Sequence, residues 1–233
     1  MKFVLPSLLL LCMLFTSNSY AQKNIIKWRP AALTWNNIDF SYERVLTNNS
    51  SFAVKAGGMI PLDFTVAFNN YKASFQAAEN NLGGYTMTKG IMGGFSVLPE
   101  FRYYTAADAP NGFYVAPYLK YWRAGFSATA TNDTTSFAST VNASINVIGV
   151  GLGIGYQWVI GDAFTVDWNF LGLGADAYIF NANVTGVNAT GTANQIKEAF
   201  PGTVTTTSNS VDYTSSPLMQ FGFKSNFSIG YMF

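Results

Sequence analysis

The chain contains no histidine, and its single cysteine is Cys12. The lack of histidine excludes Ser-His-Asp and Cys-His nucleophilic sites, Asp-His protease sites and metal centres with imidazole ligands. The lack of a second cysteine excludes an intramolecular disulfide. Enzymes that depend on a histidine are therefore excluded.

Charged residues and long apolar runs are also scarce. Charged residues make up 11% of the chain, against about 25% in an average soluble domain. Beyond residue 22 there is no run of about 20 apolar residues, so the sequence predicts no membrane-spanning helix. Yet 49% of the residues are hydrophobic. Because they occur in alternating segments, the composition is typical of a membrane β-barrel.

The N-terminus has the pattern of a secretory signal peptide. Lys2 is followed by an apolar run that ends at Phe15 and is too short to span a membrane, and then by a small, polar segment that ends at Ala21. We predict cleavage after Ala21, which gives a signal peptide of residues 1–21 and a mature domain of residues 22–233.

Removing residues 1–21 changes both the charge and the thiol content. One of the 13 basic residues is lost and none of the 12 acidic ones, so 12 of each sign remain. With no net positive charge, the mature chain is not expected to bind nucleic acid. Cys12 is lost as well; a lipoprotein anchor there is disfavoured, because Leu11 stands where such a signal needs a small residue.

Residues 217–233 show the clearest periodicity. From Met219 onward the odd positions are apolar or aromatic, apart from Ser225, and the even positions are small or polar. A period of two residues predicts a β-strand, and about 55 Å of extended chain exceeds the usual soluble strand. The pattern favours a membrane strand; a long edge strand of a soluble sandwich is the alternative.

Seven further segments extend this pattern, and together they predict an all-β fold: an eight-stranded antiparallel transmembrane up-and-down β-barrel. Asn36 and Asn37 form the first turn, since Asn tolerates positive φ, and Pro61 predicts a kink or bulge in the third strand. The predicted strands are residues 24–34, 38–46, 51–65, 91–105, 113–128, 145–160, 164–180 and 217–233.

The connections between these strands alternate in length. The connections after the second, fourth and sixth strands are short, and the predicted long loops are residues 66–89, 129–144 and 181–215. Bacterial barrels alternate short periplasmic turns with longer outer loops. Both termini lie on the periplasmic side only if the strand number is even, which supports eight.

If the apolar faces contact lipid, the opposite faces line the lumen. Eight strands enclose only enough space for side chains, and poorly solvated charges must be paired. We interpret the inward charges as a structural ion-pair network; a charged lining for a conducting or binding lumen is the alternative. The network has four acidic and four basic members: Asp39, Glu43, Lys55, Glu100, Arg102, Lys120, Asp167 and Lys224.

Every second residue from Gly149 to Gly155 is a glycine that faces the predicted lumen. Large inward side chains such as Tyr104, Tyr118 or Trp122 would fill the space these glycines leave, or a cavity remains. The spacing is not a dinucleotide-binding fingerprint, because no helix follows it.

Carboxylates are the remaining candidates for catalysis. Asp39 with Glu43, or Glu100 near Arg102, could supply an acid and a base, but paired lumen charges explain the same residues. No Walker loop is present. We predict no catalytic residue, no cofactor and no metal site.

The start of the mature chain is similar to a known group of proteins. Residues 23–46 contain the sequence Ser41-Tyr42-Glu43-Arg44. They resemble the opening of an uncharacterised family of Bacteroidota outer-membrane β-barrel proteins, similar in architecture to OmpA- and OmpX-type barrels. The resemblance implies an eight-stranded barrel and brings no activity with it. Small outer-membrane enzymes use a histidine, which this chain cannot match.

The C-terminus resembles the signal that the barrel assembly machinery reads. Asn226, Tyr231 and Phe233 fit that signal, and Ser228 stands where glycine is usual. The resemblance implies insertion into the outer membrane by that machinery.

The sequence therefore predicts a non-enzymatic outer-membrane barrel with a filled lumen, which displays its long loops for a structural, adhesive or binding role. The expected partners are outer-membrane lipid, the assembly machinery and an unidentified surface ligand, and the barrel is expected to be a monomer. The alternative is a narrow channel, or a binding barrel for a small or hydrophobic ligand.

Overall fold

The computed structural model describes residues 24–67, 69–70, 85–106, 108–132, 138–161, 163–186, 202–207 and 209–233. The predicted signal peptide, residues 1–21, lies outside the described residues. Within the described ranges, no helix combines the length and the apolar character needed to cross a membrane.

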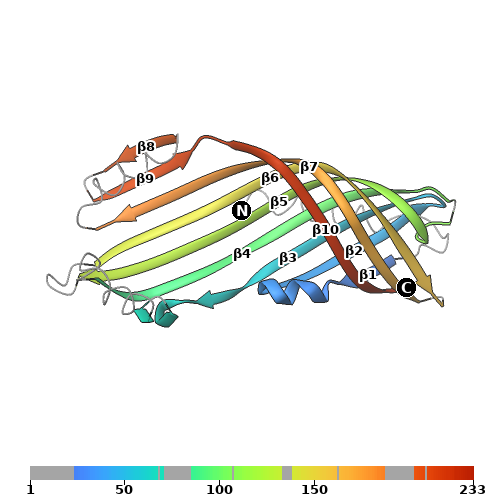
Figure 1. Ribbon diagram of the computed structural model, residues 1–233, viewed down its shortest axis with the longest axis horizontal. Coiled ribbons are helices and arrows are strands. Elements are labelled where there is room, and N and C mark those ends of the chain that lie inside the picture. Colours follow the sequence, from blue (N-terminus) through green and yellow to red (C-terminus); the bar gives the residue numbers. More distant parts are fainter. Residues whose placement is uncertain are drawn as a thin grey trace, which may run out of the picture.

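Eight antiparallel strands form a closed ring (Figure 1). Each strand pairs with the next, and β10 closes the ring by pairing with β7 on one side and β1 on the other. The predicted all-β, antiparallel up-and-down arrangement with eight ring strands is confirmed. These strands are β1 (Asn24–Trp28), β2 (Asn37–Thr47), β3 (Ser50–Asp63), β4 (Tyr85–Tyr104), β5 (Gly112–Asn132), β6 (Ala138–Ile160), β7 (Phe164–Thr185) and β10 (Leu218–Met232).

Two further strands, β8 (Gly202–Thr206) and β9 (Ser210–Ser215), bring the described total to ten. They form a hairpin whose β9 pairs with the last residues of β7, beyond the point where β10 leaves it. The prediction that residues 181–215 are a loop is therefore wrong at both ends of that range. The hairpin is held by apolar packing, since Val184 and Val211 are buried against each other.

The predicted loop at residues 129–144 is also mostly strand. Strand β5 continues to Asn132, and strand β6 already begins at Ala138. Thr129 faces Thr140, and their hydroxyl oxygens are 3.1 Å apart. The Thr- and Asn-rich composition indicated a loop, but Thr is β-branched and suits a strand. The predicted loop at residues 66–89 is also too long, because β4 begins at Tyr85.

The first predicted strand, residues 24–34, is too long. Strand β1 ends at Trp28, and Pro30–Trp35 form a 3-10 helix, η1. Proline has no N–H to donate to a sheet, so the ladder stops before it. The predicted turn at Asn36 is confirmed, because this residue has a positive φ of 57°. The predicted irregularity at Pro61 is confirmed by a register shift between Met59 and Leu62.

Side chains of the ring strands alternate between an outer and an inner face. In β10, Phe227, Ile229 and Tyr231 are exposed, whereas Asn226 and Ser228 are buried. In this strand, polar side chains thus lie inside the ring, and apolar ones lie outside it. The C-terminus lies at the end of the ring that holds the short turns, and β8 and β9 lie at the opposite end (Figure 1).

Candidate functional site

Arg102 lies at the centre of a buried group of charges inside the ring. Its guanidinium donates hydrogen bonds to the carboxylates of Glu43, Glu100 and Asp167, at 3.1 Å for Glu43 and 2.7 Å for Asp167. Lys27 Nζ contacts Glu43 and Asp167 at 2.5 and 2.8 Å. Each of these five side chains is at most 1% exposed. We call these five residues the ion-pair core.

Three neutral side chains complete the hydrogen bonding of the ion-pair core. Gln157 Oε1 accepts from both basic residues, at 2.5 and 2.8 Å. The hydroxyl of Tyr104 donates to Glu43 at 2.8 Å, and that of Tyr114 donates to Asp167 at 2.7 Å. The ring of Tyr114 also lies 4.4 Å from the guanidinium carbon of the arginine. Such complete pairing is what buried charges require.

Small residues give the long charged side chains their space. Ala53 of β3 is the register partner of Glu43 on one side and of Glu100 on the other, and it is fully enclosed. On β4, Glu100 and Arg102 point inward because their neighbours Phe101 and Tyr103 point outward. Because they are two residues apart on one strand, these two side chains of opposite charge lie next to each other on its inner face.

Six of the eight predicted lumen residues meet in one connected group. Lys55 Nζ and Lys224 Nζ join the ion-pair core through Glu100 Oε2, at 3.2 and 2.6 Å. The Nζ atom of Lys224 also lies 4.5 Å above the ring of Tyr118. The six are Glu43, Lys55, Glu100, Arg102, Asp167 and Lys224.

The other two predicted residues lie apart from that group. Asp39 pairs with Arg29, and Lys120 pairs with Asp176. Neither partner was predicted, and nor was Lys27. The interior of the described ring therefore carries more charges than the eight predicted.

Two of the three missed residues, Lys27 and Asp176, have a structural explanation. Lys27 lies between the apolar Ile26 and Trp28, so the alternation of the sequence could have predicted that its side chain points inward. Asp176 follows an irregularity, where the register of β6 against β7 shifts between Ile154 and Gly155. Past that shift the inward positions of β7 change from odd to even numbers, which sequence periodicity does not reveal.

The inward glycines of β6 leave room for aromatic side chains. A Cβ atom on Gly151 would lie 2.5 Å from Tyr118 Oη, and one on Gly155 would lie 2.5 Å from Tyr114 Oη. Of the three aromatic residues predicted to fill this space, Tyr118 does so. Trp122 instead lines a cavity.

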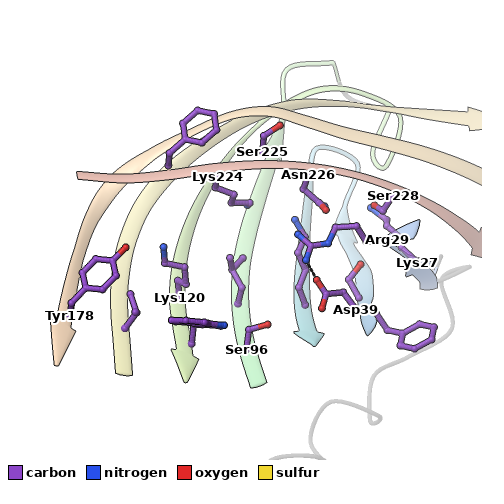
Figure 2. Close-up of a pocket in the computed structure, with 17 residues that line it drawn as sticks. Lys27, Arg29, Asp39, Ser96, Lys120, Tyr178, Lys224, Ser225, Asn226 and Ser228 are labelled. Atoms are coloured by element: carbon purple, nitrogen blue, oxygen red, sulfur yellow. Dashed lines mark hydrogen bonds and ion pairs between the residues drawn. The ribbon is translucent and has the colours of Figure 1, made fainter. Parts of the chain in front are cut away.

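That cavity, of about 350 Å³, lies beside the ion-pair core inside the ring (Figure 2). Lys120 reaches toward it from β5 and Lys224 from β10. Apolar side chains such as Leu98 and Val147 also line it, which gives it a mixed surface. We call it the basic cavity, because its charged lining side chains are five bases and one acid: Lys27, Arg29, Lys55, Lys120, Lys224 and Asp39.

The three residues of the predicted assembly signal occupy both faces of the ring. Asn226 is buried inside, and Tyr231 and Phe233 are exposed on the outer face. Tyr231 packs edge-on against Phe164 of β7 with ring centroids 5.9 Å apart. Recognition by the assembly machinery stays a prediction.

The side chains of this interior are mainly engaged in ion pairs. In the described part of the chain, no group of three or more acidic, histidine or cysteine side chains is placed to hold a metal ion. The carboxylates considered as acid–base pairs are all engaged with basic side chains. The charged groups that face the basic cavity are mainly cationic donors.

A family model described as "Protein of unknown function (DUF3575)" matches residues 7–189. No curated protein matches the chain. Among solved structures, the chain is similar to a major outer membrane protein from Thermus thermophilus, with 13% identity and a TM-score of 0.42, over 92% of this chain and 100% of that one.

Proposed function

The chain belongs to the DUF3575 family, and we propose that it is an integral β-barrel of a bacterial outer membrane with a closed lumen and a non-enzymatic role. One observation carries the proposal: a ring of eight strands has its charges inside and an apolar belt outside. A water-soluble protein has the opposite arrangement, since it keeps charges in water and apolar side chains within. The resemblance of residues 23–46 suggests a member of the Bacteroidota.

The apolar belt follows the outer face of the ring strands. On β6, Ile148, Val150 and Leu152 are more than half exposed, at 55%, 57% and 53%. Leu119 of β5 and Phe221 of β10 are exposed at 60% and 72%. Such a continuous apolar surface is unfavourable in water and favourable in the hydrocarbon core of a bilayer.

Aromatic side chains gather at the short-turn end of the belt. Membrane barrels carry aromatic girdles where the hydrocarbon meets the head groups. The short-turn end would then face the periplasm, and β8 and β9 would face outward. The exposed aromatic residues at this end include Tyr42, Phe101, Tyr103, Trp158, Phe164, Tyr231 and Phe233.

The ion-pair core supports a lumen closed to steady ion flow. Its side chains are at most 1% exposed, and they cross the interior from β1 to β4 and β7. Opening a path would break several buried ion pairs at once, and separating one such pair typically costs about 3–5 kcal/mol.

A polar hollow at the opposite end supports a role in surface interaction. It has a volume of about 610 Å³, and Arg123, Asn142, Asn183 and Asp212 line it. Asn183 Nδ2 donates a hydrogen bond to Asp212 at 2.7 Å. Polar groups displayed beyond the apolar belt are available to a partner in the envelope or outside the cell.

The proposal is tested by expressing the full chain in a Gram-negative host and isolating its outer membrane. We expect the protein there, with a heat-dependent gel shift that reports a folded barrel and no steady conductance in a planar bilayer. A soluble periplasmic protein would contradict the barrel. Discrete conductance steps from folded protein would contradict the closed lumen.

A second candidate function is a binding barrel for a small ligand. The basic cavity favours it, because a volume of about 350 Å³ falls within the range of small-molecule sites. Closure of the lumen by the ion-pair core does not conflict with this role, since the cavity lies beside the core.

A further inference from the structure

We propose that the basic cavity is a binding site for a small oxyanion of phosphate or carboxylate type. This inference rests on the second candidate function, the binding barrel, and specifies its ligand. It does not depend on the membrane around the ring.

The basic and acidic side chains inside the ring are unequal in number. Among the described residues of the interior, six side chains are basic and five are acidic. Each of the five acids already pairs with at least one base. The bases are Lys27, Arg29, Lys55, Arg102, Lys120 and Lys224, and the acids are Asp39, Glu43, Glu100, Asp167 and Asp176. By formal charge, one base is therefore in excess of the acids.

Lys55 is the base with the weakest partner. Its Nζ lies 3.2 Å from Glu100 Oε2, an atom that already accepts a hydrogen bond from Lys224 Nζ at 2.6 Å. Lys55 Nζ is buried and makes no hydrogen bond to any described residue. An ammonium group has three donors, and those of Lys55 that do not point at Glu100 are available to the cavity that this residue lines.

Two neighbouring groups in the lining also have unused polar atoms. Arg29 Nε and Ser228 Oγ are buried and make no hydrogen bond to the described residues. Ser228 is only 2% exposed. Both can donate, so three donors around one cavity lack an acceptor, while Asn226 Oδ1 is the acceptor of that lining that lacks a donor among the described residues. Leaving buried polar groups unpaired is unfavourable.

Water alone does not complete this site. Water molecules could accept from the three donors, but water is neutral and leaves the excess charge in place. An oxyanion satisfies both needs, because each of its oxygens accepts hydrogen bonds and its charge balances the lysine.

The size and lining of the cavity limit the ligand. About 350 Å³ holds an inorganic phosphate with its waters or a small organic acid. Leu98, Trp122 and Val147 supply apolar surface for a carbon skeleton. A free oxyanion and an organic phosphate or carboxylate share the same chemistry, and the test separates them.

The test is isothermal titration calorimetry of the refolded full chain in detergent micelles, with inorganic phosphate in one arm and succinate in the other. Ionic strength is held constant with chloride. The heat-dependent gel shift shows that each sample is folded. We expect saturable binding of at least one of the two anions, and of phosphate above all if the natural ligand is a phosphate.

The variants are Lys55→Gln and Lys120→Gln, with Lys89→Gln as the matched control. Lys89 lies on β4, is exposed and does not line the cavity. We expect Lys55→Gln to weaken binding tenfold or more, and Lys89→Gln to leave it unchanged. Lys120→Gln provides the same comparison if Lys55→Gln does not fold.

Two results would overturn the proposal. One is folded wild-type protein that binds neither anion beyond the level of chloride. The other is binding that the cavity variants weaken no more than Lys89→Gln does. Either result leaves the barrel intact, whereas a chain that stays soluble without detergent would contradict the barrel first.

Discussion

At the scale of single residues, the period of two explains most of the interior. Glu100 and Arg102 could be placed inside the ring from sequence, because they alternate along the strand with aromatic residues that belong to the outer face. Asp176 could not, because a local register shift in β7 changes which positions point inward. Which charges pair with which was also beyond the sequence, since the pairs join residues far apart in the chain, such as Lys224 and Glu100.

Arg102 allows the first prediction at this scale. Arg102→Met leaves the carboxylates of Glu43, Glu100 and Asp167 without their shared partner, and we expect a loss of about 3–5 kcal/mol in the free energy of unfolding. Urea unfolding in detergent or lipid measures it. Arg123→Met removes an exposed arginine that lines the polar hollow and serves as the control; equal midpoints for the two variants would contradict the role given to Arg102.

A second residue-scale prediction concerns close approach inside the ring. Gly155→Ala places a methyl group against Tyr114 Oη and the backbone oxygen of Trp168, so we expect destabilisation of about 1–3 kcal/mol. Gly93→Ala meets no atom within 4 Å and should cost little. Urea unfolding measures both variants. An unchanged free energy of unfolding for Gly155→Ala would mean that Tyr114 has room to move.

At the scale of elements, strand existence was more predictable than strand length. The eight ring strands follow from alternating apolar residues and tight turns. Their ends away from the short turns were missed, because strands β5, β6 and β7 continue there into Thr- and Asn-rich sequence whose partly or fully exposed positions, such as Ser127, Asn142 and Asn183, are polar. Strand β1 was overestimated for the opposite reason, since Pro30 ends its hydrogen bonding and starts η1.

The β8–β9 hairpin gives a prediction at the scale of elements. Within the described ranges, the hairpin pairs with the ring only through β9 and the last residues of β7. Deletion of residues 202–215 should therefore leave the ring folded, with the heat-dependent gel shift retained. Loss of the shift in that deletion, while Thr203→Arg in the intact chain keeps it, would show that the hairpin is part of the folding unit.

At the scale of the whole molecule, the inverted distribution of polarity is the main support for a membrane barrel. Eight strands close into a ring, charges pair inside it, and apolar side chains face outward. The sequence predicted this arrangement because residues of the outer face and of the inner face alternate along each strand. It did not predict the basic cavity, which depends on how side chains from β1, β3, β5 and β10 meet across the interior.

The most direct test of the account is the stability of Leu152→Arg in lipid vesicles. Leu152 is 53% exposed on the outer face of β6, among other apolar residues. If that face contacts lipid, the arginine should lower the free energy of unfolding by about 2–4 kcal/mol. Thr203→Arg, at an exposed position of β8 beyond the belt, should change it little. Equal stability of both variants and the wild type would mean that Leu152 faces water, and it would contradict the membrane barrel.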